Sequence, residues 1–143
     1  MATVLWNLAG RPDTGERAHP FNDVSENAWY TDGITWAATH GIASGYGDGI
    51  FAPDDNITRE QMAVILFNYA TAMNLPLPRV RVGGFADDTS ISPWARQAVN
   101  ALFEAGIING MPDGSGGIIF ASQNGATRPE VAMLLMNFIN AIP

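Results

Sequence analysis

The sequence contains no cysteine and few basic residues. Of its 143 residues, 7 are Lys or Arg and 14 are Asp or Glu, which gives a formal net charge of −7 at pH 7. The absence of cysteine excludes disulfides, thiol catalysis and thiolate metal sites. The shortage of basic residues argues against a nucleic-acid partner, because phosphate binding needs clustered Lys and Arg side chains. The same balance argues against simple electrostatic attachment to an anionic membrane.

Long hydrophobic runs are also missing. No apolar run approaches the ~18 residues that a membrane span needs, so we expect no membrane insertion. The apolar start, residues 1–8, is too short for a signal peptide and lacks its basic beginning, so any export signal is expected outside this chain. Apolar residues still make up 47% of the sequence, and we therefore expect a folded chain.

A repeated unit fills most of the sequence. Residues 21–24 (FNDV) correspond to 85–88 (FADD), and residues 45–49 (GYGDG) correspond to 110–114 (GMPDG). Further shared positions are Trp29 and Trp94, Gly41 and Gly106, Phe51 and Phe120, Thr58 and Thr127, and Arg59 and Arg128. Such self-similarity indicates tandem modules.

The repeat predicts two full modules, at 21–75 and 85–143, joined by linkers at 13–20 and 76–84. The opening residues align with the closing helix of a module, so residues 1–12 are expected to be the last helix of a truncated first copy. About three such units are usually needed for stability, because each buries its apolar face only against a neighbour. The truncated copy supplies a third helix or leaves an apolar face open to a homo-oligomer.

Local signals predict a mostly α-helical chain. Apolar residues at helical spacing predict helices over 29–40 and 93–105, with Ser92 as an N-cap before a first-turn proline. Gly41 and Gly106 are expected to end these helices in the left-handed conformation. A further helix should follow each repeated threonine, because Gln61 or Glu130 three residues later completes a capping box.

Taken together, the motifs resemble the S-layer homology (SLH) module. That family's pattern is Phe-x-Asp-Val, a Trp-led helix ending at Gly-Ile, Gly-Tyr-x-Asp-Gly, Phe-x-Pro and Ile-Thr-Arg-x-Glu. The middle copy carries these pieces at 21–24, 29, 41–42, 45–49, 51–53 and 57–61. The sequence departs from the pattern at Gln61, which replaces Glu, and at Asp88 and 111–112 of the last copy, which also has an insertion at 115–119.

The resemblance implies tandem helix-loop-helix modules arranged as a pseudo-threefold, three-pronged spindle around a central helical bundle. It also implies an extracellular anchor at the bacterial cell wall or cell surface, without catalytic activity, cofactor or metal. Its expected partner is secondary cell-wall polysaccharide, a peptidoglycan-linked glycan that often ends in pyruvylated N-acetylmannosamine. The grooves between neighbouring modules would hold this polymer.

The resemblance also implies the ligand-binding residues. They are Arg59, Asp23, Trp29, Gly45, Tyr46 and Thr58, and, in the last copy, Arg128, Asp87, Trp94 and Gly110. The chemical argument is strongest for the two arginines, since a guanidinium beside a helix N-terminus suits a carboxylate. Because the last copy departs from the pattern, we expect the groove with Arg59 to bind better.

Structural roles compete with ligand contact at these positions. Capping accounts for the threonines, and the tryptophans at 29 and 94 suit a core staple as well as sugar stacking. Trp6 and Trp36 are expected to pack in the core. The aspartates at 23 and 87 suit either sugar hydroxyls or the cap of the following turn.

Two other functions compete with the anchor. One is a structural or assembly module of the same fold without a functional groove, which acts as a spacer or a self-association unit. The other is a wall hydrolase that uses Asp54, Asp55 or Glu60, although no second feature of a glycosidase dyad accompanies these acids. The loop 45–51 lacks the dense oxygen ligands of a calcium site, which favours a turn.

Overall fold

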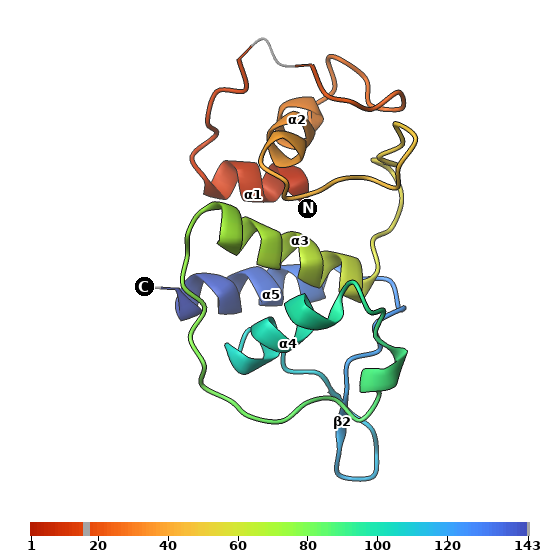
Figure 1. Ribbon diagram of the computed structural model, residues 1–143, viewed down its shortest axis with the longest axis vertical. Coiled ribbons are helices and arrows are strands. Elements are labelled where there is room, and N and C mark those ends of the chain that lie inside the picture. Colours follow the sequence, from red (N-terminus) through yellow and green to blue (C-terminus); the bar gives the residue numbers. More distant parts are fainter. Residues whose placement is uncertain (16–17, 143) are drawn as a thin grey trace. The chain divides into compact units, whose positions relative to one another are not determined.

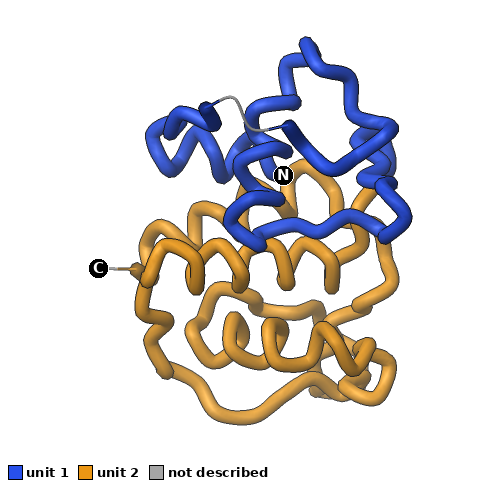
Figure 2. Tube along the Cα trace, turned by 45° about the horizontal axis from the view of Figure 1, so that its top comes forward, with its two compact units in different colours: residues 1–55 blue, residues 56–143 orange. Residues whose placement is uncertain are grey.

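The computed structural model describes residues 1–15 and 18–142, so two positions of the expected linker 13–20 and the last residue lie outside the described residues. Over the described part, the chain has five α-helices, one 3-10 turn and one two-stranded hairpin (Figure 1). It divides into two compact units, Met1–Asp55 and Asn56–Pro143 (Figure 2). The division falls inside the expected module 21–75, between its loop and its closing helix.

In the first unit, α1 (Ala2–Leu8) packs against α2 (Thr31–Thr39). Gly33 permits this close approach, because a Cβ atom there would lie 2.7 Å from the Cα of Thr3. The buried core includes Leu5, Ile34, Trp36, Ala37 and Ile42. Trp36 is therefore a packing residue, as expected, and Trp6 is half-buried with its Nε1 donating to the carbonyl of Pro12.

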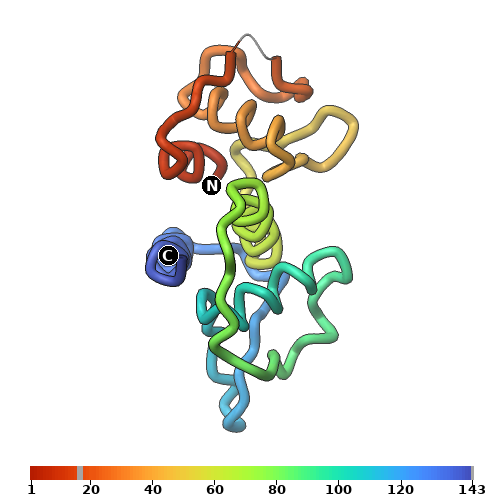
Figure 3. Tube along the Cα trace, turned by 60° about the vertical axis from the view of Figure 1, so that its left-hand side comes forward, coloured from red at the N-terminus to blue at the C-terminus, as the bar shows by residue number. Residues whose placement is uncertain are grey.

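In the second unit, α3 (Arg59–Ala72) packs against α4 (Arg96–Glu104). The Tyr69 ring of α3 meets the Phe138 ring of α5 (Arg128–Ala141) edge to face, with centroids 5.8 Å apart. Figure 3 shows α3 in yellow-green, α4 in teal and α5 in blue. The fully buried side chains of this unit include Leu66, Val99, Leu102, Ile107, Phe120 and Phe138.

The insertion of the last copy forms a small hairpin. Its strands, β1 (Met111–Pro112) and β2 (Ile118–Ile119), are antiparallel, and Met111 pairs with Ile119. The Asp113 carboxylate closes the turn by accepting hydrogen bonds from Ser115 and from the Gly117 N–H at 2.9 Å. The 3-10 turn η1 (Asp88–Ser90) lies earlier in the same copy.

The ends of α2 and α4 confirm the expected glycine caps. Gly41 and Gly106 have φ values of 66° and 75°. In each case the next N–H reaches back to the helix, from Ile42 to the Ala37 carbonyl at 2.8 Å and from Ile107 to the Leu102 carbonyl at 2.9 Å. These are the six-to-one bonds of a Schellman motif, which satisfy carbonyls that the helix leaves open.

The starts of the helices divide into two cases. Both capping boxes are present, at Thr58 of α3 and Thr127 of α5. The N-cap expected at Ser92 is wrong, because α4 begins at Arg96 after Ala95 and has no side-chain cap. Ser92 instead donates its hydroxyl to Glu60 of α3 at 2.8 Å and its N–H to the same carboxylate at 3.0 Å. A long-range bond has thus replaced the local cap.

Candidate functional site

The start of α3 is tied to a loop of the following module. The Arg59 N–H donates to the Asn124 carbonyl at 2.9 Å, and the Glu60 N–H donates to the Ser122 carbonyl at 3.1 Å. Because the first N–H groups of a helix have no partner inside the helix, this loop completes the helix N-terminus. The contact also places the Arg59 side chain at the junction of the two modules.

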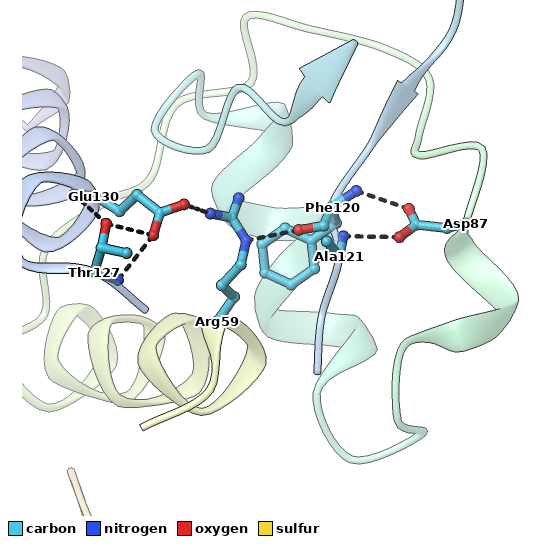
Figure 4. A network of polar contacts seen from close by, with 6 residues as sticks. All are labelled: Arg59, Asp87, Phe120, Ala121, Thr127 and Glu130. Carbon is cyan, nitrogen blue, oxygen red and sulfur yellow. Dashed lines mark hydrogen bonds and ion pairs between the residues drawn. The ribbon is translucent and has the colours of Figure 1, made fainter. Parts of the chain in front are cut away.

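The Arg59 side chain is 9% exposed and is held at several points. Its Nε donates to the Phe120 carbonyl at 2.7 Å, its Nη1 donates to Glu130, and its guanidinium carbon lies 5.2 Å from the centre of the Phe120 ring (Figure 4). Within the described part of the chain, Nη2 donates to no residue. Arg59 is therefore a fixed cation whose Nη2 group and second Nη1 N–H remain open.

Glu130 joins the capping box of α5 to Arg59. One carboxylate oxygen accepts from the Thr127 N–H at 2.8 Å and from the Thr127 hydroxyl at 2.7 Å, and the other oxygen accepts from Arg59 (Figure 4). The Thr127 N–H, its hydroxyl and, to a smaller extent, the Arg59 guanidinium hold the pKa of Glu130 below its ordinary value. Glu130 is therefore ionised at neutral pH.

Arg59 and Glu130 meet at a cavity of about 170 Å³. The other walls are mostly apolar and include Met62, Met111, Met133 and Leu134. Gly110 also lines the cavity in the left-handed conformation, with φ of 72°, and a Cβ atom there would lie 2.7 Å from the Phe85 ring. Gly45 of the first unit has the same geometry, with φ of 68°.

Asp23 and Asp87 hold later loops of their own copies rather than the following turn. Asp87 accepts from the N–H groups of Phe120 at 2.7 Å and Ala121 at 2.8 Å (Figure 4). Asp23 accepts from the equivalent Phe51 and Ala52 at 2.9 and 2.7 Å, and the Phe51 N–H is the main cause of its lowered pKa. Asp87 thus positions the residue whose carbonyl binds Arg59.

The tryptophans at 29 and 94 are exposed, by 80% and 57%, so the core-staple interpretation is wrong for both. Each lies in the turn before its helix, because α2 and α4 begin two residues after these positions. The Trp29 ring meets the Tyr30 ring edge on, with centroids 5.5 Å apart. Tyr46 is 56% exposed in the glycine-rich loop of the same unit.

The two repeated arginines differ in their surroundings. Arg128 is exposed at the first position of α5 and donates to no residue in the described ranges 1–15 and 18–142. Of the predicted site residues, only Arg59 and Gly110 line the cavity, while Thr58 caps α3 beside it. Asp23, Trp29, Gly45 and Tyr46 belong to the first unit.

Sequence reasoning missed Glu130 as the partner of Arg59. A signal was present, since the family pattern has Glu as the second residue after Thr-Arg, and only the last copy keeps it, as Glu130, while the middle copy has Gln61. Glu60, proposed above as an acid of a hydrolase, is 3% exposed and accepts from Ser92 and Gln123. Among the described residues, no cluster of three or more acidic or His side chains is suited to hold a metal ion. No helix of the described part is long and apolar enough to cross a membrane.

Comparison with known proteins agrees with this repeat. The model of the S-layer homology domain matches residues 20–63 and 84–132. The chain is 28% identical over 141 residues to Cell surface glycoprotein 1 of Acetivibrio thermocellus, covering 94% of this chain. It is 34% identical to an amylopullulanase of Thermoanaerobacterium thermosulfurigenes and 35% identical to Exoglucanase XynX of A. thermocellus, each over 97% of this chain.

The chain spans only 6%, 7% and 12% of the lengths of these three relatives. The match therefore concerns a shared module and not the whole of each protein. The family model covers well over half of this chain, in two copies whose bounds follow the internal repeat. This chain belongs to the S-layer homology domain family.

Proposed function

We propose that this chain is a non-catalytic anchor that holds an extracellular protein to the bacterial cell wall by binding secondary cell-wall polysaccharide. Family membership supports the cell-surface role, as does the relative named a cell surface glycoprotein. Two other relatives are named as carbohydrate-active enzymes, and this chain matches only a small share of each. A module attached to such different proteins suits an anchor better than a shared catalytic step.

The observation that carries the proposal is the cavity beside Arg59. A guanidinium fixed by Phe120 and Glu130 offers its open Nη2 group next to a small, mostly apolar space. Sugars present hydroxyls at their edges and apolar C–H groups on their faces, which suits this combination. Arg128, which has no ion-pair partner among the described residues, supplies a cation at a second helix N-terminus, where a carboxylate is favoured.

We also propose the pseudo-threefold, three-pronged spindle with a central helical bundle, the linkers at 13–20 and 76–84, and modules at 21–75 and 85–143. A repeated contact supports it: α1 packs on α2 in the first unit as α3 packs on α4 in the second. Residues 1–12 would then be the closing helix of the first module.

The test is co-sedimentation of the purified protein with bacterial sacculi, before and after chemical removal of secondary polysaccharide. We expect binding before removal and none after it. Binding that survives removal contradicts the proposed ligand and points to peptidoglycan. Absence of binding to both preparations, with a native circular dichroism spectrum, contradicts the anchor function itself.

One observation favours the alternative, a self-associating structural module. On α5, Met133, Met136 and Ile139 are 57%, 56% and 49% exposed, whereas Ala70 of α3, equivalent to Ile139, is 1% exposed. An open apolar face of this kind favours association with a second copy. Sedimentation velocity at several concentrations separates the two functions: a monomer throughout that binds sacculi excludes the alternative.

A further inference from the structure

Methionine is concentrated in the walls of the cavity beside Arg59. Three of the chain's six methionines line it: Met62 of α3, Met111 of β1 and Met133 of α5. The middle copy has Tyr46 at the position equivalent to Met111 and Val64 at the position equivalent to Met133. Two of these thioethers therefore belong to the last copy alone, and they give its cavity a reactivity that tyrosine and valine would not.

The three side chains differ in their access to solvent. Met62 is 3% exposed, Met111 is half-buried and Met133 is 57% exposed. An oxidant must reach the sulfur, so the susceptibility of a methionine follows its exposure. We therefore expect Met133 to react first among the cavity methionines. Met136, three residues further along α5, is 56% exposed and does not line the cavity.

Oxidation of Met133 changes the chemistry of the cavity wall. The sulfur attacks an oxygen atom of hydrogen peroxide, an S–O bond forms, the O–O bond breaks, and water leaves. The sulfur is oxidised and the peroxide is reduced. The product, methionine sulfoxide, is polar and carries an oxygen that accepts hydrogen bonds, whereas the thioether is apolar.

A new acceptor in this cavity has donors available. Arg59 lines the same cavity, and its Nη2 group and second Nη1 N–H donate to no residue in the part of the chain that the structure describes. A hydrogen bond from a charged donor is roughly twice as strong as one between neutral groups. A sulfoxide at position 133 therefore competes with a sugar for the Arg59 donors, and it also removes an apolar wall from the sugar's face.

We propose that Met133 is an oxidation site that regulates the cavity: a hydroperoxide converts its thioether to the sulfoxide, and the sulfoxide weakens the binding of wall polysaccharide beside Arg59. This inference rests on the proposed function and adds a form of regulation to the same site. The thioether is the binding form. Methionine sulfoxide reductases restore it, because this step of methionine oxidation is reversible.

Two variants of α5 separate the role of Met133 from general oxidative damage. Met133→Leu removes the sulfur and nearly keeps the side-chain volume, so the apolar wall remains. Met136→Leu is the matched control, because Met136 has nearly the same exposure outside the cavity. The parent chain and both variants are treated with graded doses of hydrogen peroxide. Tandem mass spectrometry of their peptides measures the sulfoxide fraction at each methionine, and circular dichroism checks that the treated chains are folded.

The binding probe is purified secondary polysaccharide, titrated by calorimetry before and after the peroxide treatment. At a dose that oxidises most of Met133 but little of Met62, the parent chain and Met136→Leu should lose affinity about tenfold, the size of a hydrogen bond to a charged group. Met133→Leu should keep its affinity. Incubation of the oxidised parent chain with methionine sulfoxide reductases should restore the original affinity.

The outcomes separate the inference from the function. Equal losses of affinity in the parent chain and Met133→Leu, or an oxidised Met133 with unchanged affinity, overturn the role of Met133 and leave the polysaccharide function standing. Oxidation of Met62 or Met111 ahead of Met133 overturns the argument from exposure. If the untreated parent chain is folded and does not bind the polymer, the proposed function fails and the inference fails with it.

Discussion

Arg59 shows how a side chain expected at a solvated helix start becomes part of the fold. Its partners Phe120 and Glu130 lie 61 and 71 residues further along the chain, so no local pattern reveals them. Arg128 occupies the same place in the repeat, yet it is exposed and has no such partners within the part of the chain that the structure describes. Identical motif positions therefore carry different energetic roles.

Arg59→Ala should destabilise the second unit by about 2 kcal/mol, because it leaves the partly buried Glu130 and the Phe120 carbonyl without their donor. Arg128→Ala should change the free energy of unfolding by less than about 0.5 kcal/mol and lower only polymer binding. Urea unfolding measures both variants. Equal stability losses for the two arginines would contradict the distinction.

Asp87→Ala should cost about 2 kcal/mol, since two backbone N–H groups, of Phe120 and Ala121, lose their acceptor. Ala121 has a φ of 53°, a left-handed conformation that the two bonds help to maintain. Thermal unfolding provides the measurement, and Asp13→Ala, at an exposed position of the first unit, serves as the comparison. A loss of stability no greater than that of Asp13→Ala would contradict the role of Asp87 as the acceptor for these two N–H groups.

Acid should destabilise the protein through its hydrogen-bonded carboxylates. The fold lowers the pKa of Asp23 and Asp113 from the ordinary 3.8, and that of Glu130 from 4.5. Their stabilising effect is fully present above these ordinary values and is lost as the pH falls through the lower pKa values of the folded state. The melting temperature should therefore fall as the pH drops below about 5, and less steeply in Glu130→Gln.

At the scale of elements, the closing helices α3 and α5 could be predicted from the sequence. The starts of the opening helices α2 and α4 could not. The capping boxes of α3 and α5 are local, so the sequence contains all of their signals. The start of α4 depends on Glu60, which binds Ser92 from 32 residues away. The exposure of Trp94 and the formation of the cavity beside Arg59 also depend on contacts between residues far apart in the sequence. Hydrophobic periodicity therefore does not predict them.

Thr127→Ala should destabilise the protein by about 1 kcal/mol, the usual cost of a lost N-cap. It should also loosen Glu130, because the Thr127 hydroxyl that donates to this carboxylate is lost, although the Thr127 N–H still donates to it. Thr89→Ala, at an exposed threonine of η1, is the matched control. Chemical unfolding of both variants tests this, and equal costs would contradict the role of the cap.

For the whole molecule, the compact units do not coincide with the sequence modules. The division at residues 55 and 56 cuts the expected module 21–75, because α3 packs on α4, the opening helix of the next copy. The fragment 56–143 should therefore fold cooperatively, while the fragment 76–143 should not, because it lacks α3. Circular dichroism with thermal unfolding of both fragments measures this, and a cooperative transition in the shorter one would contradict it.

The offset between modules and compact units has an evolutionary consequence. Arg59 comes from one copy of the repeat, while Gly110 and Glu130 come from the next. The cavity therefore needs two neighbouring copies, and neither copy forms it alone. Duplication, deletion or reordering of copies then creates new neighbour pairs without a single substitution. Under the proposed function, the sugar preference of such an array depends on the order of its modules as much as on their sequences.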